Sequence, residues 1–305
     1  MRHPSAIAGG LALATLLAGC DVTTSRTNVA ATTTSSAASV ITSTVVVAPS
    51  TTGGTASNSS APAVATLSGN TIAQQFQVAG QPSIVVANDA GATMLSAAQD
   101  GAVSVKAEKH ADSPDALSHM QVSMTQEGNT IHVVFQRGSD VTGNEYVNVT
   151  ITAPADSALQ VTTHAGAVTA TGFRRGLTAH SDAGELSVDN VMGDLNLRTS
   201  AGAIRAMGVN GAVDAETSAG AVTVSGALHG ANTVRASSGR IAVSIPAASA
   251  LSVRASTGAG SISNDFGFPV TGGPAGGTFS GTIGSGSDGS LNLQASTGSV
   301  TLQRS

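Results

Sequence analysis

Small aliphatic residues alternate with polar residues in short runs over most of the chain after residue 67. Pairs such as Leu186/Val188 and Leu195/Leu197 place every second side chain on one face, which is the period of a β-strand with one buried side. Glycine and β-branched residues occur throughout these runs and disfavour helices. The pattern predicts an all-β protein built from short strands.

The predicted strands recur with a period of about 18 residues from residue 162 onward. A small–small–Gly step begins each unit, and a strand, a second Gly turn and a second strand follow. No unit of this length can bury its apolar face alone, so neighbouring units must stack. We therefore predict a single-chain β-solenoid, similar to a right-handed parallel β-helix, with about 18 residues per coil. The step glycines, expected to supply the positive φ of a tight corner, are Gly166, Gly184, Gly202, Gly220, Gly239 and Gly258.

Stacked coils would align equivalent residues in columns about 4.8 Å apart. One predicted column carries alternating charges that suit a solvated outer face, with a ligand site as the alternative. Its members are His180, Arg198, Glu216, Arg235 and Arg254.

A second predicted column has the residue types of a hydrolase triad, His164, Asp182 and Ser200. A triad requires the histidine between the other two residues. Here the aspartate would occupy the middle coil, which leaves His164 and Ser200 about 9–10 Å apart at strand spacing. We expect no catalysis at this column.

The segments on either side of the regular repeat are less periodic. Residues 67–161 are β-rich, with a hairpin predicted at Gly128-Asn129, and are interpreted as first coils plus a wider capping sheet. A separate small β domain is the alternative. The regular solenoid covers residues 162–305, with a Gly-rich insertion at 264–290.

The insertion contains Phe266, Phe268 and Phe279, which form either a cap or a binding loop. We favour a cap, because an open sheet edge invites self-pairing. The stretch from Gly284 to Gly289 matches a dinucleotide-binding fingerprint by letter. A strand follows it instead of the required helix, so no cofactor is predicted.

The N-terminal residues predict export and lipid attachment. Residues 1–19 contain a short apolar core typical of a signal peptide, and they end at Leu17-Ala18-Gly19-Cys20, which resembles a lipoprotein cleavage site. Cys20 is therefore the predicted lipid attachment residue. Residues 20–66 are rich in Ser, Thr and Ala, and are predicted to be the anchor and a disordered linker. A Val-rich strand at residues 45–47 is the alternative there.

Composition limits the classes of function. The 305 residues carry a net charge of −5, which argues against nucleic-acid binding, because that requires a basic surface. The single cysteine excludes an internal disulfide and a four-cysteine zinc site. No metal site is predicted, because the seven histidines lack ligand spacing.

The repeated units Thr199-Ser200-Ala201-Gly202-Ala203-Ile204 and Thr217-Ser218-Ala219-Gly220-Ala221-Val222 resemble a known family. This is the bacterial putative-adhesin family of β-strand-repeat envelope proteins, a domain of unknown function. The segment Ile151-Thr152-Ala153-Pro154 is similar to it as well, and the resemblance covers roughly residues 75–302. It implies a repeated β fold and carries over no catalytic residues.

These observations predict a lipid-anchored cell-envelope protein, held at the extracytoplasmic side of a bacterial membrane. Its solenoid would serve surface contact, adhesion or a structural role, without catalysis. The expected partners are the membrane, through the lipid anchor, and an envelope protein or polysaccharide. An accessory protein of envelope-stress signalling is the first alternative. A polysaccharide-acting β-helix enzyme is the second, although such enzymes need clustered carboxylates and aromatic platforms.

Overall fold

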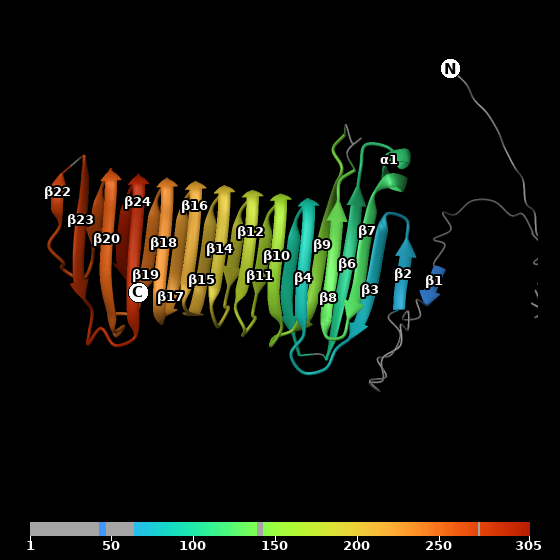
Figure 1. Ribbon diagram of the computed structural model, residues 1–305, viewed down its shortest axis with the longest axis horizontal. Coiled ribbons are helices and arrows are strands. Elements are labelled where there is room, and N and C mark those ends of the chain that lie inside the picture. Colours follow the sequence, from blue (N-terminus) through green and yellow to red (C-terminus); the bar gives the residue numbers. More distant parts are fainter. Residues whose placement is uncertain (1–42, 47–63, 100, 139–142, 274) are drawn as a thin grey trace, which may run out of the picture. The chain divides into compact units, whose positions relative to one another are not determined.

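The computed structural model describes residues 43–46, 64–99, 101–138, 143–273 and 275–305. Strands lie side by side in a long series, and one short helix, α1 (Pro114–His119), occurs within these ranges (Figure 1). No helix in the described ranges is long and apolar enough to cross a bilayer. The predicted signal peptide, Cys20 and most of the predicted linker lie outside the described residues.

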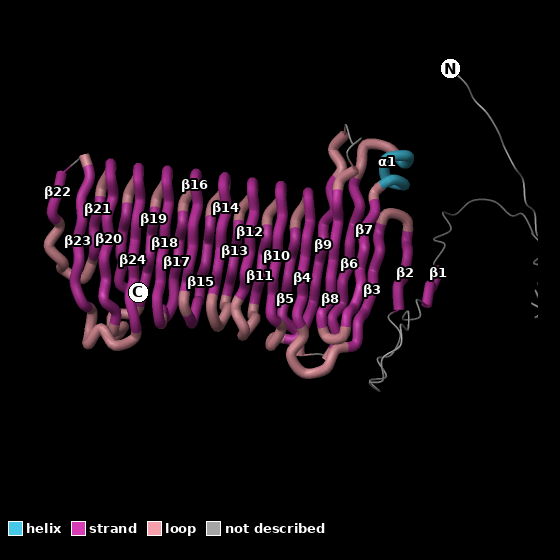
Figure 2. Tube along the Cα trace, viewed as in Figure 1, coloured by secondary structure: helices cyan, strands magenta, loops and turns pink. Residues whose placement is uncertain are grey.

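Two sheets, termed A and B, contain the strands of these ranges, which are magenta in Figure 2. Buried aliphatic side chains from both sheets form one continuous core. Sheet A has the order β1 (Ser43–Val46), β2 (Val64–Ser68), β3 (Thr71–Gln77), β6 (Ala102–His110), β9 (Tyr146–Pro154), β5 (Thr93–Ala98), β11 (Val168–Thr171), β13 (Leu186–Asp189), β15 (Ile204–Gly211), β17 (Val222–Leu228), β19 (Ile241–Ile245), β25 (Val300–Arg304) and β21 (Ile262–Asn264). Sheet B has the order β22 (Thr271–Gly273), β23 (Gly276–Thr282), β20 (Leu251–Ala259), β24 (Gly289–Thr297), β18 (Gly230–Ser238), β16 (Val213–Ala219), β14 (Leu195–Ala201), β12 (Leu177–Ala183), β10 (Ala158–Ala165), β4 (Ser83–Ala90), β8 (Thr130–Gln136) and β7 (Gln121–Glu127).

Successive coils are in register at the predicted period. Leu177 of β12 pairs in parallel with Leu159 of β10 and with Leu195 of β14, and Leu195 pairs with Val213 of β16. These aliphatic residues are buried. Each coil places one strand in sheet B and the next in sheet A. The apolar side chains of a coil lie between the two sheets and are covered by those of the neighbouring coils. The predicted all-β solenoid with 18-residue coils is confirmed.

The less periodic N-terminal part belongs to the same two sheets. The coil β4/β5 lies between β8/β9 on one side and β10/β11 on the other. A two-residue turn at Gly128 joins β7 and β8, as the hairpin pattern predicted. Strand β1 and the start of β2 fall inside the interval 20–66, where a linker was expected. Val45 and Val46 of β1 pair with Ala65 and Val64 of β2, and the rest of the interval before residue 64 lies outside the described residues.

The C-terminal coil β24/β25 enters the stack out of chain order. Strand β24 lies between β18 and β20, and β25 lies between β19 and β21. Arg254 therefore pairs with Asn292, and Gln294 takes the position after Arg235 in the predicted charge column. Including Arg254 in that column was wrong, because the pattern shows the order of coils along the chain and not their order in the stack.

Aromatic side chains close the C-terminal end of the core. The Phe268 ring lies between those of Phe266 and Phe279, with centroid separations of 6.2 and 6.0 Å. Phe279 is 2% exposed and the other two rings pack against the core. The Arg304 guanidinium lies 5.1 Å from the centre of the Phe266 ring. This arrangement is the cap that was favoured over a binding loop.

Candidate functional site

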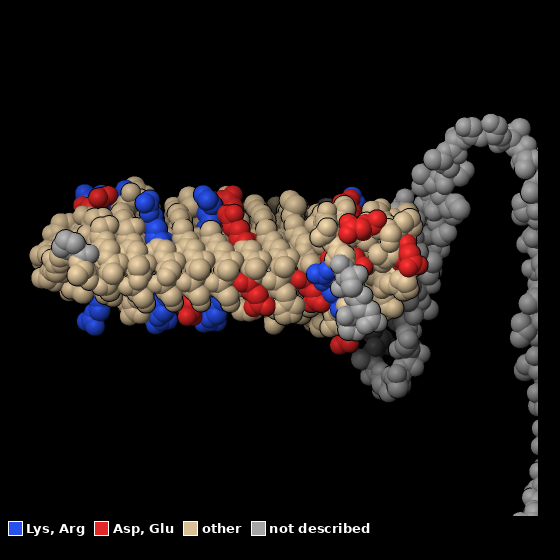
Figure 3. Space-filling view, turned by 90° about the horizontal axis from the view of Figure 1, so that it is seen from above, with Lys and Arg blue, Asp and Glu red and all other residues tan. Residues whose placement is uncertain are grey.

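A narrow strip of small residues runs along one side of the solenoid, where each coil turns from sheet B into sheet A. Figure 3 looks down on this strip, which lies between rows of charged residues. We call it the glycine rim. Its exposed members include Ser200, Ala201, Ser218, Ala219 and Ser237, and its central column is Gly91, Gly166, Gly184, Gly202, Gly220, Gly239, Gly298 and Gly260.

Close backbone packing explains the glycines of the rim. A Cβ atom on Gly202 would collide with the carbonyl oxygen of Gly184, and one on Gly220 would collide with that of Gly202. A positive φ was the expected reason, and it holds at Gly220, where φ is 153°. Gly202 and Gly166 have no φ in the left-handed region. The column therefore needs glycine first for the approach of neighbouring coils.

Gly258, the last of the predicted turn glycines, lies outside this column. Gly298 stacks on Gly239, and Gly260 stacks on Gly298. The insertion of β24/β25 changes which coil follows Gly239 in the stack, and the bend of β20 falls two residues later than the 18-residue spacing suggested.

Buried hydroxyl groups support the rim from inside. Thr199 and Thr217 donate to the carbonyl oxygens of Gly184 and Gly202 at 3.3 and 3.0 Å. Both threonines are buried, so each offsets the desolvation of a carbonyl at the bend. Sequence reasoning quoted these threonines within the repeat but gave them no role. The recurrence of threonine three residues before Gly166, Gly202 and Gly220 was the available signal.

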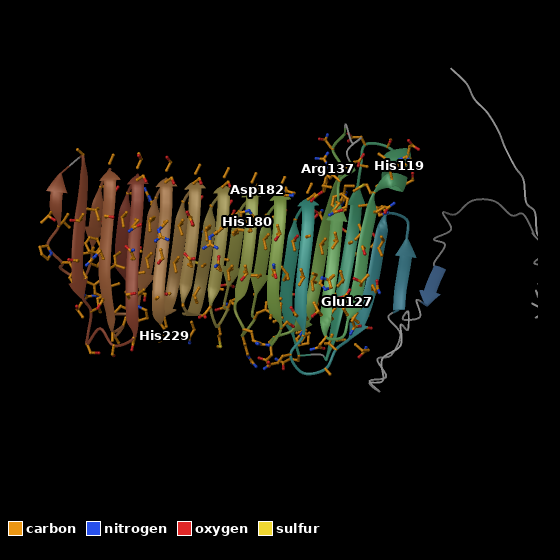
Figure 4. The ribbon with its side chains drawn as sticks, viewed as in Figure 1. His119, Glu127, Arg137, His180, Asp182 and His229 are labelled. Carbon is orange, nitrogen blue, oxygen red and sulfur yellow. The ribbon has the colours of Figure 1, made fainter. Side chains whose placement is uncertain are left out.

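A cluster of histidines and aspartates lies at the N-terminal end of the rim. His164 Nδ1 lies 2.7 Å from Asp182 Oδ2, and His180 Nε2 lies 3.2 Å from Asp182 Oδ1. Asp89 approaches the other side of His164, at 3.7 Å from Nε2. Figure 4 shows His180 and Asp182 together on β12. Sequence reasoning missed Asp89, although Asp89-Ala90-Gly91 repeats the letters of Asp182-Ala183-Gly184.

The contacts in this cluster shift two pKa values in opposite directions. The hydrogen bond to Asp182 raises the pKa of His164. The same bond lowers the pKa of Asp182, and the charges of both histidines add to the effect. Both side chains are exposed to solvent, so the cluster is a surface ion pair that strengthens when His164 is protonated.

The cluster lacks the arrangement of a hydrolase. Asp182 occupies the middle coil between His164 and Ser200, as predicted. It bridges His164 and His180, a contact that was not predicted, and Ser200 makes no hydrogen bond to either histidine in the described structure. In the same residues, no group of His, Cys, Asp or Glu side chains is placed to hold a metal ion. The geometry supports ionic and hydrogen-bonded contact and offers no nucleophile–base pair.

Charged side chains also lie on the outer face of sheet B. The Arg198 guanidinium lies 2.7 Å from Asp214 and 3.6 Å from Glu216, and the Nε of Arg235 donates to Gln294 at 3.2 Å. All of these groups contact solvent. Exposed pairs of this kind contribute little to stability. Their main effects are on the register between neighbouring strands of sheet B and on the charge of its outer face.

The comparisons with known proteins concern the repeated coils. No protein with a curated description matches this chain significantly. A solved structure of a putative cell adhesion protein from Clostridium sporogenes is similar at 13% identity and a TM-score of 0.37, covering 76% of this chain and 99% of that one. A putative adhesin from Bacteroides fragilis is similar at 12% identity and a TM-score of 0.38, covering 76% and 96%.

The sequence profile of one family, Toastrack DUF4097, matches residues 148–303. This range begins in β9 and contains the regular coils, the out-of-order coil and the aromatic cap. It spans half of the 305 residues, and the resemblance expected from the Thr-Ser-Ala-Gly-Ala units is confirmed. The chain therefore belongs to the Toastrack DUF4097 family.

Proposed function

We propose that this protein is a lipid-anchored, non-catalytic component of the bacterial cell envelope that binds an extended partner along its glycine rim. The observation that carries the proposal is the rim itself. Its backbone is held between coils by hydrogen bonds such as those from Gly184 N to Ala201 O and from Gly202 N to Ala219 O, both 3.0 Å long. A stack of equal coils offers a long and rigid contact surface, which suits repeat proteins that bind macromolecules.

The side chains of the rim support contact in preference to chemistry. They are short serines and alanines that lose little conformational entropy when covered. Three carboxylates close to rim glycines in the sequence already have partners: Asp89 and Asp182 contact His164, and Glu185 contacts Arg205. A partner that lies along the rim would therefore meet a flat surface with hydroxyl groups at regular intervals.

Binding of the full chain to isolated envelope fractions tests the contact surface. Ala201→Arg together with Ala219→Arg places two bulky charges on the exposed rim, and we expect binding to fall at least tenfold with little change in melting temperature. Thr223→Arg, on the outer face of sheet A, is the matched control and should bind as the wild type does. Equal binding by all three proteins would refute the rim as the contact surface.

Lipid attachment is tested separately. Metabolic labelling with a fatty acid should mark the wild type and Ser25→Ala, and it should not mark Cys20→Ser. An intact mass without an acyl addition on the wild-type protein would contradict the anchor.

A further inference from the structure

A shallow depression of about 250 Å³ lies at the end of the solenoid where α1 packs. The last residues of β6, the first residues of β9 and the β2–β3 turn form its walls. It adjoins the glycine rim, because a Cβ on Gly91 would meet the carbonyl oxygen of Val147, the second residue of β9. Nothing in the rim or the charged columns accounts for it.

Two stacked rings form one wall of the depression. Tyr146 and His110 are cross-strand neighbours, and their rings lie 4.6 Å apart with an interplanar angle of 11°. Asn148 Nδ2 lies 3.4 Å from His110 Nε2, which holds the imidazole in place. Tyr146 remains 38% exposed. The phenylalanines of the described chain are buried or partly buried against the core, so Tyr146 presents the most exposed ring among its Phe and Tyr residues.

Planar polar groups surround the rings. Asn70 Nδ2 donates to Lys109 O at 2.8 Å, and Asp112 Oδ2 accepts from Asn144 N at 3.1 Å. These bonds fix the two side chains and leave Asn70 Oδ1 and Asp112 Oδ1 without a hydrogen bond from any described residue. An aromatic plane beside fixed amide and carboxylate oxygens is therefore available to a ligand with both apolar C–H groups and hydroxyl donors.

We propose that this depression binds one pyranose ring of a neutral or N-acetylated polysaccharide. The C–H face of the ring would stack on Tyr146, and its hydroxyl groups would donate to Asn70 and Asp112. A volume of about 250 Å³ admits a single sugar ring, and the neighbouring rim would receive the rest of the polymer. The inference deepens the proposed function by naming its partner class, and it rests on that function only for the polymer beyond the first ring.

The chain itself provides the probe for this site. It has one tyrosine and no tryptophan, so its intrinsic emission reports on Tyr146. Titration of the full chain with cellohexaose and with chitohexaose should change this emission saturably for at least one of them, with a Kd of roughly 0.1–1 mM, as expected of a small open site. Inorganic phosphate serves as the anion control and should have no effect.

Variants separate the platform from the polar groups. Asp112→Asn should weaken binding of the responding oligosaccharide at least tenfold in the same titration, and Asp115→Asn, on the exposed first turn of α1, should not change it. Tyr146→Ala should abolish retardation of the protein in gels that contain the matching polysaccharide, and Tyr146→Phe should retain it.

The outcomes distinguish this inference from the proposed function. A Tyr146 signal that no oligosaccharide changes would overturn the sugar site, and continued rim-dependent binding to envelope fractions would leave the proposed function standing. A response to phosphate alone would show an anion site and also overturn the inference. If Tyr146→Ala does not fold, unchanged binding by Asp112→Asn would still refute it.

Discussion

At the scale of single residues, glycine is required for different reasons at different points of one repeat. Glycines of the rim are required where neighbouring coils touch, as at Gly202 and Gly184. Gly176, at the opposite bend, has a φ of 79°, a conformation that favours glycine by itself. A substitution at Gly202 therefore acts through contact with the next coil, and one at Gly176 acts through such contact and through backbone conformation as well.

Replacement of a rim glycine should destabilise the fold. Gly202→Ala brings a Cβ against the carbonyl oxygen of Gly184, and the two coils must separate to accommodate it, at a cost of about 1–3 kcal/mol. Ser200→Ala, two residues away and exposed, should change the free energy of unfolding by less than about 0.5 kcal/mol. Urea denaturation of both variants measures the difference. Equal stabilities would contradict close packing as the reason for the glycine.

The buried threonines allow a comparison within one column. Thr217→Val removes the hydroxyl that bonds to Gly202 O at 3.0 Å, and we expect a loss of about 1 kcal/mol. Thr163 occupies the same column, but its buried hydroxyl has no hydrogen-bond partner in the described structure. Thr163→Val should therefore be neutral or stabilising in the same denaturation assay. A loss of stability at Thr163 as large as at Thr217 would refute this account.

The histidine–aspartate cluster should make stability depend on pH. The raised pKa of His164 contributes stability that is complete below the ordinary histidine value of about 6.5 and is lost as pH rises through the raised value. The lowered pKa of Asp182 contributes stability above about 3.9 that is lost as pH falls through the lowered value.

His164→Asn should therefore have its largest deficit in melting temperature between about pH 4 and 6.5, and the deficit should shrink above that range. His229→Asn is the control, because His229 is exposed and has no carboxylate partner among the described residues. A deficit of His164→Asn that stays constant from pH 5 to 9 would contradict the ion pair.

Residues that recur every 18 positions could be predicted from the sequence. Residues whose role depends on one particular tertiary contact could not. The rim glycines from Gly166 to Gly239 and the middle position of Asp182 follow from the 18-residue spacing, whereas Gly91, Gly298 and Gly260 do not. Asp89 and Tyr146 lie in the irregular part, where no spacing indicates their neighbours. Their roles depend on the coil β4/β5 lying next to the coil β8/β9 in the stack.

At the scale of elements, the two ends of the solenoid depart from chain order in the same way. Strands β4 and β5 lie between two coils that come later in the chain, β8/β9 and β10/β11, and β24 and β25 lie between two earlier coils, β18/β19 and β20/β21. The alternating pattern predicted each of these strands, because alternation depends only on which face is buried. It could not predict their neighbours, because a strand with small aliphatic residues pairs equally well with several others.

Hydrogen exchange should reveal the position of the last coil. The amides of β24 and β25 have partners on both sides, so we expect them to exchange as slowly as those of β16 and β17. The amides of β22, a three-residue strand at the edge of sheet B, should exchange much faster. Mass spectrometry of peptides from these strands measures both. Rapid exchange in β24 would contradict its place inside the sheet.

At the scale of the whole folded part, the aromatic cap closes the C-terminal end of the core. Phe279→Ala should lower the free energy of unfolding by about 3 kcal/mol, because its ring is almost wholly buried. Val270→Ala, at an exposed position nearby, should cost less than about 0.5 kcal/mol. We also expect Phe279→Ala to promote end-to-end association, since an uncovered sheet edge pairs readily. Sedimentation velocity measures the association, and a stable monomeric variant would refute the cap.

The insertion of β24/β25 also constrains the order in which the protein can assemble. A chain that emerges from its N-terminus can add coils one after another as far as β18/β19, each onto a finished surface. The next coil to emerge, β20/β21, has its permanent neighbour in a segment that appears only 38 residues later, as the pairing of Leu251 with Gly289 shows. Strands β20 and β21 therefore remain without their parallel neighbours until β24 and β25 have appeared. Parallel pairing between segments so far apart in the sequence is slow. Any chaperone that binds this protein while it folds would find its longest-lived exposed edge there.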